Sequence, residues 1–141
     1  MNLIKFWKNN TQKRLTIYAY IYSAIFRLQI FWIKPKYLQR HWGTEGEESA
    51  EEEAPWKYKY AMHVSYVVNR ICSKTAWESK CLVRALTAQK LLKKKKICST
   101  LYLGCGMEDG KMVAHAWLRC GRLYVCGGDG TGYSIVDKFS A

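Results

Sequence analysis

The stretch "ESKCLVRALTAQKLL", residues 78–92, decides how the rest of this chain is interpreted. Its leucines and alanines recur at helical spacing, which predicts an amphipathic helix with one buried face. Ser79 is a residue type that caps helix N-termini, and this places Cys81 in the first turn. Unpaired backbone N–H groups at a helix start favour an anion, so Cys81 has a setting suited to a thiolate nucleophile. A small buried core residue is the competing interpretation.

Downstream of this helix the hydrophobic period changes from helical to alternating. Strands are predicted over 97–106, 112–119 and 122–127, and the segment "YSIVDKF" is predicted to be a closing strand. Upstream, apolar residues at helical spacing predict a second helix within 56–74. The order of helices followed by strands predicts an α+β domain, an antiparallel sheet with the Cys-bearing helix packed across it.

The N-terminal third of the chain is predicted to be helical. Residues 15–33 are nearly continuously apolar, and Thr16, Ser23 and Arg27 mark a narrow polar stripe at helical spacing. Arg27 near the centre counts against a transmembrane span, because a central arginine is costly to insert. Three interpretations stay open: the helix packs on the domain, docks on a partner, or lies on a membrane surface.

The charges are unevenly distributed. The chain carries a formal net charge of +12, yet six of its eleven acids lie in "TEGEESAEEEAP", residues 44–55. We interpret this segment as a solvated acidic linker between an N-terminal helical region, 1–43, and a domain over 56–141. The alternative is that the segment folds back on the basic surface of the domain. The positive charge points to an acidic partner, and a basic binding module without chemistry is the rival function class. No RNA-binding motif is present, so nucleic acid is not expected as a partner.

The six cysteines do not indicate disulfides or a metal site. The N-terminal segment "MNLIKFWKNNTQKRL" lacks the apolar core and small-residue cleavage site of a signal peptide, which predicts a cytoplasmic chain with reduced thiols. No C-x-x-C pair exists, and the three histidines do not complete a regular ligand set. We therefore expect neither a metal nor another cofactor.

His115 is the natural partner for Cys81. It lies 34 residues downstream, on the predicted strand 112–119. A helix, an extended run and a tight turn fill the interval, and this path brings the strand back beneath the helix start. A Cys–His pair is the minimum for an activated thiolate nucleophile. A buried cysteine and a core histidine would be the structural alternative.

Two segments resemble a known family. "WESKCLVRALTAQKLLKKKKICSTLYLGCG" and "AHAWLRCGRLYVCGG" are similar to the transglutaminase-like leader peptidases of lasso-peptide biosynthesis. The resemblance rests on Trp before Cys-Leu, on Arg-Ala-Leu, on a strand ending in Leu-Gly and on His-Ala-Trp, and it covers about residues 56–141. It implies a transglutaminase-like, papain-like cysteine peptidase core that removes the leader from a ribosomally made precursor peptide.

The resemblance also implies partners and roles. A separate leader-recognition protein would present the precursor, and a lasso cyclase would then close the ring. Cys81 would be the nucleophile and His115 the base, with N–H groups at the helix start binding the oxyanion. A transglutaminase-like acyl transferase would use the same pair and stays an alternative, as does membrane association.

The third catalytic position departs from the family pattern. The family places an Asp about twelve residues beyond the His, and that position here is Gly127. Asp129, two residues further, is the predicted residue that orients His115. Asp137 and a backbone carbonyl are the alternatives. Trp117, on the same strand face as His115, is predicted to be a packing platform for the imidazole.

Overall fold

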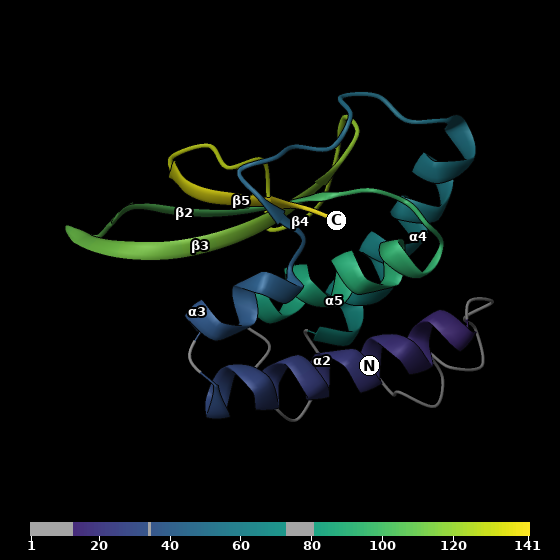
Figure 1. The fold of residues 1–141 in the computed structure, drawn as a ribbon, viewed down its shortest axis with the longest axis horizontal. Coiled ribbons are helices and arrows are strands. Elements are labelled where there is room, and N and C mark those ends of the chain that lie inside the picture. The colour runs from purple at the N-terminus through teal and green to yellow at the C-terminus, as the bar shows by residue number, and fades with distance from the viewer. Residues whose placement is uncertain (1–12, 34, 73–80) are drawn as a thin grey trace.

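Helices pack on one face of an antiparallel sheet in this protein (Figure 1). The structure is a computed structural model that describes residues 13–33, 35–72 and 81–141. Helix α5, Cys81–Lys94, lies across the sheet, and the helical region of α2, Lys13–Trp32, precedes this core. The predicted α+β class, with a sheet packed on the Cys-bearing helix, is confirmed. The predicted cap at Ser79 lies outside the described residues.

The sheet of the described chain has five strands in the order β1-β5-β2-β3-β4, and every pair is antiparallel. The strands are β1 Thr44–Glu45, β2 Thr100–Glu108, β3 Lys111–Cys120, β4 Leu123–Cys126 and β5 Ser134–Ser140. Asp109 and Gly110, both with positive φ, close the β2–β3 hairpin as a two-residue turn. β1 was not predicted, because two residues carry no detectable period.

The two faces of the sheet are covered by different parts of the chain. On β3, Ala116, Leu118 and Cys120 belong to the core that the sheet shares with the helices. Successive side chains on a strand point to opposite faces, so Trp117 and Arg119 lie on the other side. The alternation places His115 with them, away from the main helical layer.

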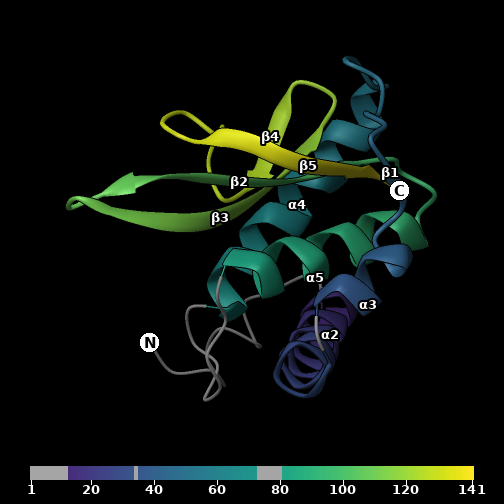
Figure 2. The same ribbon diagram turned by 60° about the vertical axis from the view of Figure 1, so that its left-hand side comes forward.

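Helices α4 and α5 provide most of the core beneath the sheet (Figure 2). α4 spans Pro55–Cys72, and a proline suits the first helical position because its missing N–H would have no partner there. Its buried residues include Val64, Val67, Val68 and Ile71, the stripe predicted from sequence. The short helix α3, Pro35–Leu38, and the 3₁₀ turn η1, Gln39–His41, connect α2 to the sheet.

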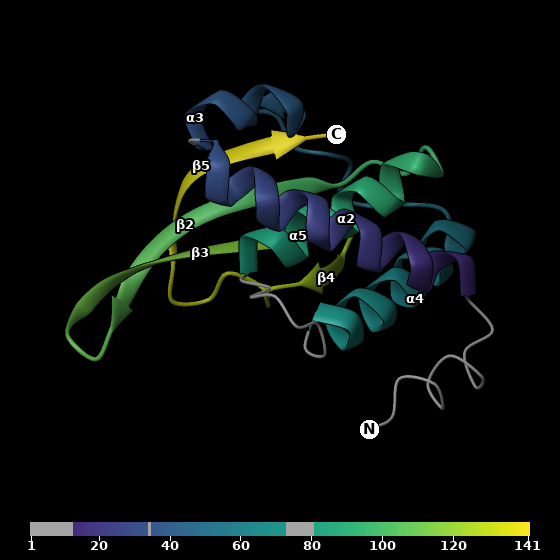
Figure 3. The ribbon, with the colours of Figure 1, turned by 90° about the horizontal axis from the view of Figure 1, so that it is seen from below.

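Helix α2 is the outermost layer, on the far side of α4 and α5 from the sheet (Figures 2 and 3). Leu15, Thr16, Ala19 and Ser23 are buried against the domain. The predicted polar stripe therefore begins on the inward face, where small side chains let helices approach closely, and large apolar residues point outward. One face of α2 packs on the domain, as one of the three interpretations proposed. No helix in the described part of the chain is long and apolar enough to cross a membrane.

Most residues of the acidic segment 44–55 are exposed, but the segment also folds back on the domain, which was the alternative to a plain linker. It crosses the sheet on the side away from α5 (Figure 1). The guanidinium of Arg119 donates to the carbonyls of Ser49 and Ala50, each at 3.1 Å. The backbone N–H of Ser49 donates to Oγ1 of Thr100 at 2.8 Å. These contacts fasten the segment to the sheet and tie the N-terminal helical region to the strands.

Candidate functional site

Cys81 and His115 both border one cavity of about 470 Å³. The alternation along β3 nevertheless directs the imidazole of His115 to the face of the sheet away from α5. Cys81 is the first residue of α5, and His115 lies in the middle of β3. The remaining wall is largely apolar and comes from α2, the η1–β1 connection, α5, β2 and β3: Arg27, Ile30, Trp42, Leu82, Val83, Leu103, Gly104, Ala114 and Ala116. Both sequence-predicted residues thus border a cavity whose wall includes α2, but the described structure does not bring the imidazole to the thiol.

The helix start provides more than the thiol. The first N–H groups of an α-helix have no intrahelical acceptor and carry the positive end of the helix dipole. In α5 these groups belong to the first turn, which begins with Cys81, Leu82 and Val83. All three residues line the cavity. This turn can therefore stabilise a thiolate and, during a reaction, an oxyanion.

The imidazole of His115 is held in an aromatic stack. Its ring centre lies 4.6 Å from that of Tyr133 and 5.9 Å from that of Trp117, both with interplanar angles of 24°. The predicted role of Trp117 as a packing platform is confirmed. Gly104 makes room for it, since a Cβ there would lie 2.8 Å from Cη2 of Trp117. The sequence did not predict Tyr133 as a contact of His115, because Tyr133 lies in the connection between β4 and β5, which has no periodic pattern.

A backbone carbonyl fixes the tautomer of His115. Nε2 lies 2.6 Å from the carbonyl oxygen of Gly127. A carbonyl only accepts, so Nε2 carries the proton and the neutral ring presents Nδ1 as a base. Gly127 has φ +80°, and a Cβ there would collide with the carbonyl oxygen of Ala116. Glycine is thus required at the position where the family pattern has Asp.

The two candidate carboxylates lie elsewhere. Oδ1 of Asp129 accepts from the Thr131 hydroxyl at 2.6 Å and from the Thr131 N–H at 3.0 Å, and these bonds lower the pKa of Asp129. Asp137 accepts from the N–H of Lys138, and its hydrogen bond to Glu45 raises the pKa of that glutamate. In this structure neither carboxylate bonds to His115.

The thiol of Cys81 and the imidazole of His115 are not in contact in this structure. No hydrogen bond joins Sγ of Cys81 to the imidazole among the described residues, and Nδ1 of His115 has no described partner. β4 pairs with β3 only over Leu118–Cys120, so the edge of β3 at His115 is open on that side. An approach of the imidazole to α5 would require a rearrangement of β3 around His115, because a strand side chain keeps to its own face of the sheet. Catalytic hydrogen bonds are often long before substrate binds.

Comparison with known families agrees with this geometry. The family model described as the transglutaminase-like superfamily matches residues 30–136, which include Cys81 and His115. The chain belongs to the transglutaminase-like superfamily. That superfamily includes cysteine peptidases and acyltransferases, and its members generally act by cysteine-peptidase-like chemistry. Searches of curated proteins and of solved structures give no match.

The other buried thiols differ from the thiol at the transglutaminase-like site. Burial raises the pKa of Cys120 to about 11 and that of Cys126 to about 12. Both side chains face the core and stay protonated at neutral pH, whereas Cys81 is half-buried at a cavity wall. Among the described residues no group of three or more His, Cys, Asp or Glu side chains could hold a metal ion.

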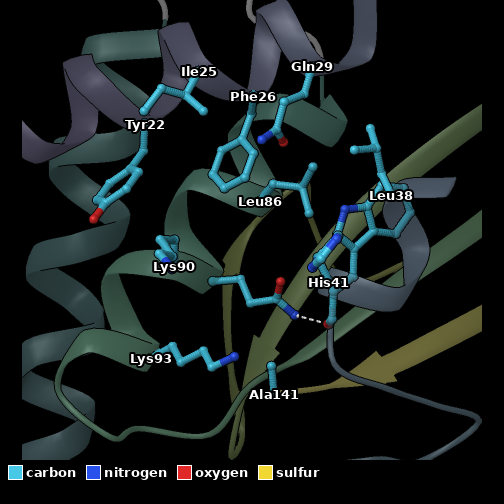
Figure 4. Close-up of a pocket in the computed structure, with 12 residues that line it drawn as sticks. Tyr22, Ile25, Phe26, Gln29, Leu38, His41, Leu86, Lys90, Lys93 and Ala141 are labelled. Atoms are coloured by element: carbon cyan, nitrogen blue, oxygen red, sulfur yellow. Dashed lines mark hydrogen bonds between the residues drawn. The ribbon is translucent and has the colours of Figure 1, made fainter. Parts of the chain in front are cut away.

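A second cavity, of about 320 Å³, shares Trp42 with the transglutaminase-like site (Figure 4). Tyr22, Ile25, Phe26 and Gln29 of α2 line it on one side, and Leu86, Lys90 and Lys93 of α5 line it on the other. None of the predicted catalytic residues belongs to this second cavity. Its two lysines distinguish it from the largely apolar wall around Cys81.

Proposed function

We propose that this chain is a cysteine peptidase that removes the leader from a ribosomally synthesised lasso-peptide precursor. The observation that carries the peptidase chemistry is the position of Cys81 at the start of α5, on the wall of a cavity that strand β3 around His115 also borders. The proposal includes a movement of β3 that brings the imidazole to the thiol. The lasso-precursor substrate rests on the resemblance of the segments around these two residues to lasso leader peptidases. A leader-recognition protein and a lasso cyclase are the proposed partners, and the cytoplasm is the proposed location.

The first half of the reaction forms a thioester. Nδ1 of His115 takes the proton from Sγ of Cys81, and the thiolate attacks the scissile carbonyl carbon. N–H groups in the first turn of α5 stabilise the oxyanion of the tetrahedral intermediate. The imidazolium then gives its proton to the leaving amine, which departs as the new N-terminus, while the leader stays bound to Sγ.

The second half releases the leader. A water molecule gives a proton to Nδ1 of His115 and attacks the thioester carbonyl carbon, and the C–S bond breaks with return of the proton to the sulfur. The leader leaves with a free carboxylate. Throughout both halves the Gly127 carbonyl accepts from Nε2, which keeps Nδ1 as the exchanging nitrogen. In this proposal the carbonyl takes the positioning role that the sequence suggested for Asp129.

Cys81→Ala tests the nucleophile. Incubation of the precursor peptide with the recognition protein and this variant should show cleavage reduced by at least about 10³-fold by mass spectrometry, because the loss of a nucleophile removes the covalent route. Circular dichroism should show an unchanged fold. Cys98→Ala is the matched control, since Cys98 is exposed and lies outside the cavity. Normal cleavage by Cys81→Ala would contradict the proposal.

The same assay separates hydrolysis from acyl transfer. Both reactions pass through a thioester on Cys81, and only the acceptor differs. With a primary amine added in excess, a peptidase should still release a leader with a free carboxylate. A leader carrying the amine as its main product would identify the chain as an acyl transferase.

A further inference from the structure

The outward face of α2 is a continuous apolar surface. Its main residues follow helical spacing, and together with Phe31 we call them the outer stripe of α2: Ile17, Ile21, Ile25, Leu28, Phe31 and Trp32. Exposure is greatest towards the end of the helix, where Leu28 is 58% exposed, Phe31 66% and Trp32 76%. Contiguous apolar surfaces of this kind on a folded protein mark an interaction site.

The shape of this surface suits a flat or deformable partner. α2 is a single helix on the outside of the molecule: Figure 2 shows it below α5, and Figure 3, the view from below, shows it in front of α5. Of the outer stripe only Ile25 lines the second cavity, so the rest of the stripe lies outside that hollow. The large side chains of the stripe project away from the domain instead, as on helices that lie in a membrane interface.

Cations flank the outer stripe where α5 runs beside it. Nζ of Lys94 lies 4.3 Å from the ring centre of Tyr18 and 3.4 Å from the hydroxyl of Tyr22. Lys90 and Lys93 line the second cavity, whose wall also includes Ile25 of the stripe (Figure 4). The described part of α2 contains no acidic residue, and the first acid in the sequence is Glu45.

We propose that the outer stripe of α2 and the lysines of α5 bind the surface of an anionic phospholipid membrane. The stripe would enter the boundary between headgroups and acyl chains, and Lys90, Lys93 and Lys94 would contact headgroup phosphates. Among the described residues, only positive charge lies beside the convex apolar stripe, and this favours a lipid surface as the partner. A partner protein would need a concave apolar surface bordered by acidic residues to match both the stripe and the lysines. The binding is peripheral and is independent of the proposed peptidase activity.

Vesicle flotation of the full-length protein tests the binding. The protein should float with vesicles of phosphatidylcholine and phosphatidylglycerol and should stay unbound with phosphatidylcholine alone. Binding should weaken as salt is added, because salt screens the lysines. Absence of flotation with the anionic vesicles would overturn the proposal.

Two sets of substitutions locate the surface. Leu28→Ser, Phe31→Ser and Trp32→Ser combined should abolish flotation, and so should Lys90→Glu, Lys93→Glu and Lys94→Glu combined. The matched control combines Met107→Ser, Met112→Ser and Val136→Ser, which are comparably exposed but lie on the sheet strands β2, β3 and β5 and should leave flotation unchanged. Wild-type flotation by the serine variant of α2 would overturn the proposal, since the lysines alone would then suffice.

A fluorescence measurement separates insertion from protein association. Emission of the wild type should shift to the blue on anionic vesicles, and Trp32→Phe should lose most of this shift while still floating. A self-association of the wild type that the serine variant of α2 abolishes, without vesicle binding, would instead make the stripe a protein interface and overturn the lipid proposal.

Discussion

Two positions of strand β3, its C-terminal end and its middle, use polar side chains in opposite ways. At one end Arg119 is 7% exposed, and its guanidinium donates to the Tyr102 hydroxyl and to three backbone carbonyls. In the middle of the strand His115 has one ring nitrogen bound to the Gly127 carbonyl, and the residue borders an open cavity. A polar side chain whose hydrogen-bond partners are all present stabilises the fold, whereas one with an unpartnered atom is available for a reaction.

The largest expected effect is at the histidine. His115→Ala should reduce the rate of precursor cleavage by about 10²–10⁴-fold, because it removes the proposed general base. The midpoint of thermal unfolding should fall only modestly, since the imidazole makes one hydrogen bond and otherwise stacks on Tyr133 and Trp117. Cleavage rates and a thermal melt measure the two quantities. A large fall in stability with normal cleavage by the folded fraction would show that His115, like Arg119, has a structural role and not a catalytic one.

The arginine should show the reverse behaviour. Arg119→Met should lower the free energy of unfolding by about 3 kcal/mol, because several buried carbonyls lose their donor together. Urea denaturation measures this change, and cleavage per folded molecule should stay normal. The matched control is Arg122→Met. Arg122 pairs with Glu52 at 2.7 Å, but both side chains are largely exposed, so the loss should be below about 1 kcal/mol. Equal losses for the two variants would remove the basis for calling Arg119 structural.

A smaller effect distinguishes the residue that positions His115. Gly127→Ala should displace the backbone carbonyl and lower kcat by about 10–100-fold with little change in KM, because the imidazole loses its orientation. Asp129→Ala should change kcat by less than about twofold, since that carboxylate bonds to Thr131. If Asp129→Ala has the larger effect, the carboxylate moves to His115 during turnover.

The smallest effect concerns the thiol beside Arg119. Burial raises the pKa of Cys120 to about 11, so the folded state holds its proton at pH values where the unfolded chain releases it. This contribution to stability is complete below about pH 8.5 and is lost as the pH rises towards 11, at up to about 1.4 kcal/mol per pH unit. Urea denaturation from pH 8 to 10.5 measures the slope. Cys120→Ala should flatten it, and Cys98→Ala, at an exposed site, should not.

The sequence predicted the chemistry-bearing elements better than their surroundings. Helix α5 and the strand of His115 have strong periodicity, so both residues were placed on the right elements. The docking of the acidic segment was only the alternative prediction, because Arg119 holds it through backbone carbonyls, and carbonyls leave no signal in residue type. The direction of α2 was undetermined for another reason, since a helix apolar on nearly all sides has no preferred inward face.

The positioning of His115 was only partly predictable. A carbonyl was one of three alternatives, and the glycine at position 127 was the available clue, because it stands where the family pattern has Asp. Its φ of +80° and its closeness to Ala116 could not be predicted, since they follow from the way the chain leaves β4. The stacking of Tyr133 on the imidazole depends on the same crossing.

The chain could be cut within its acidic segment without separating the two resulting pieces. Glu47 and Glu48 are exposed, while the contacts of Ser49 and Ala50 with the sheet lie just beyond them. A protease cut before Ser49 would leave two pieces. The smaller would carry Arg27 and Ile30, which complete the wall around Cys81, and its helix would still be packed against α5. Supplied separately, the two fragments should regain activity only on mixing, so the chain offers a natural point for building a split enzyme.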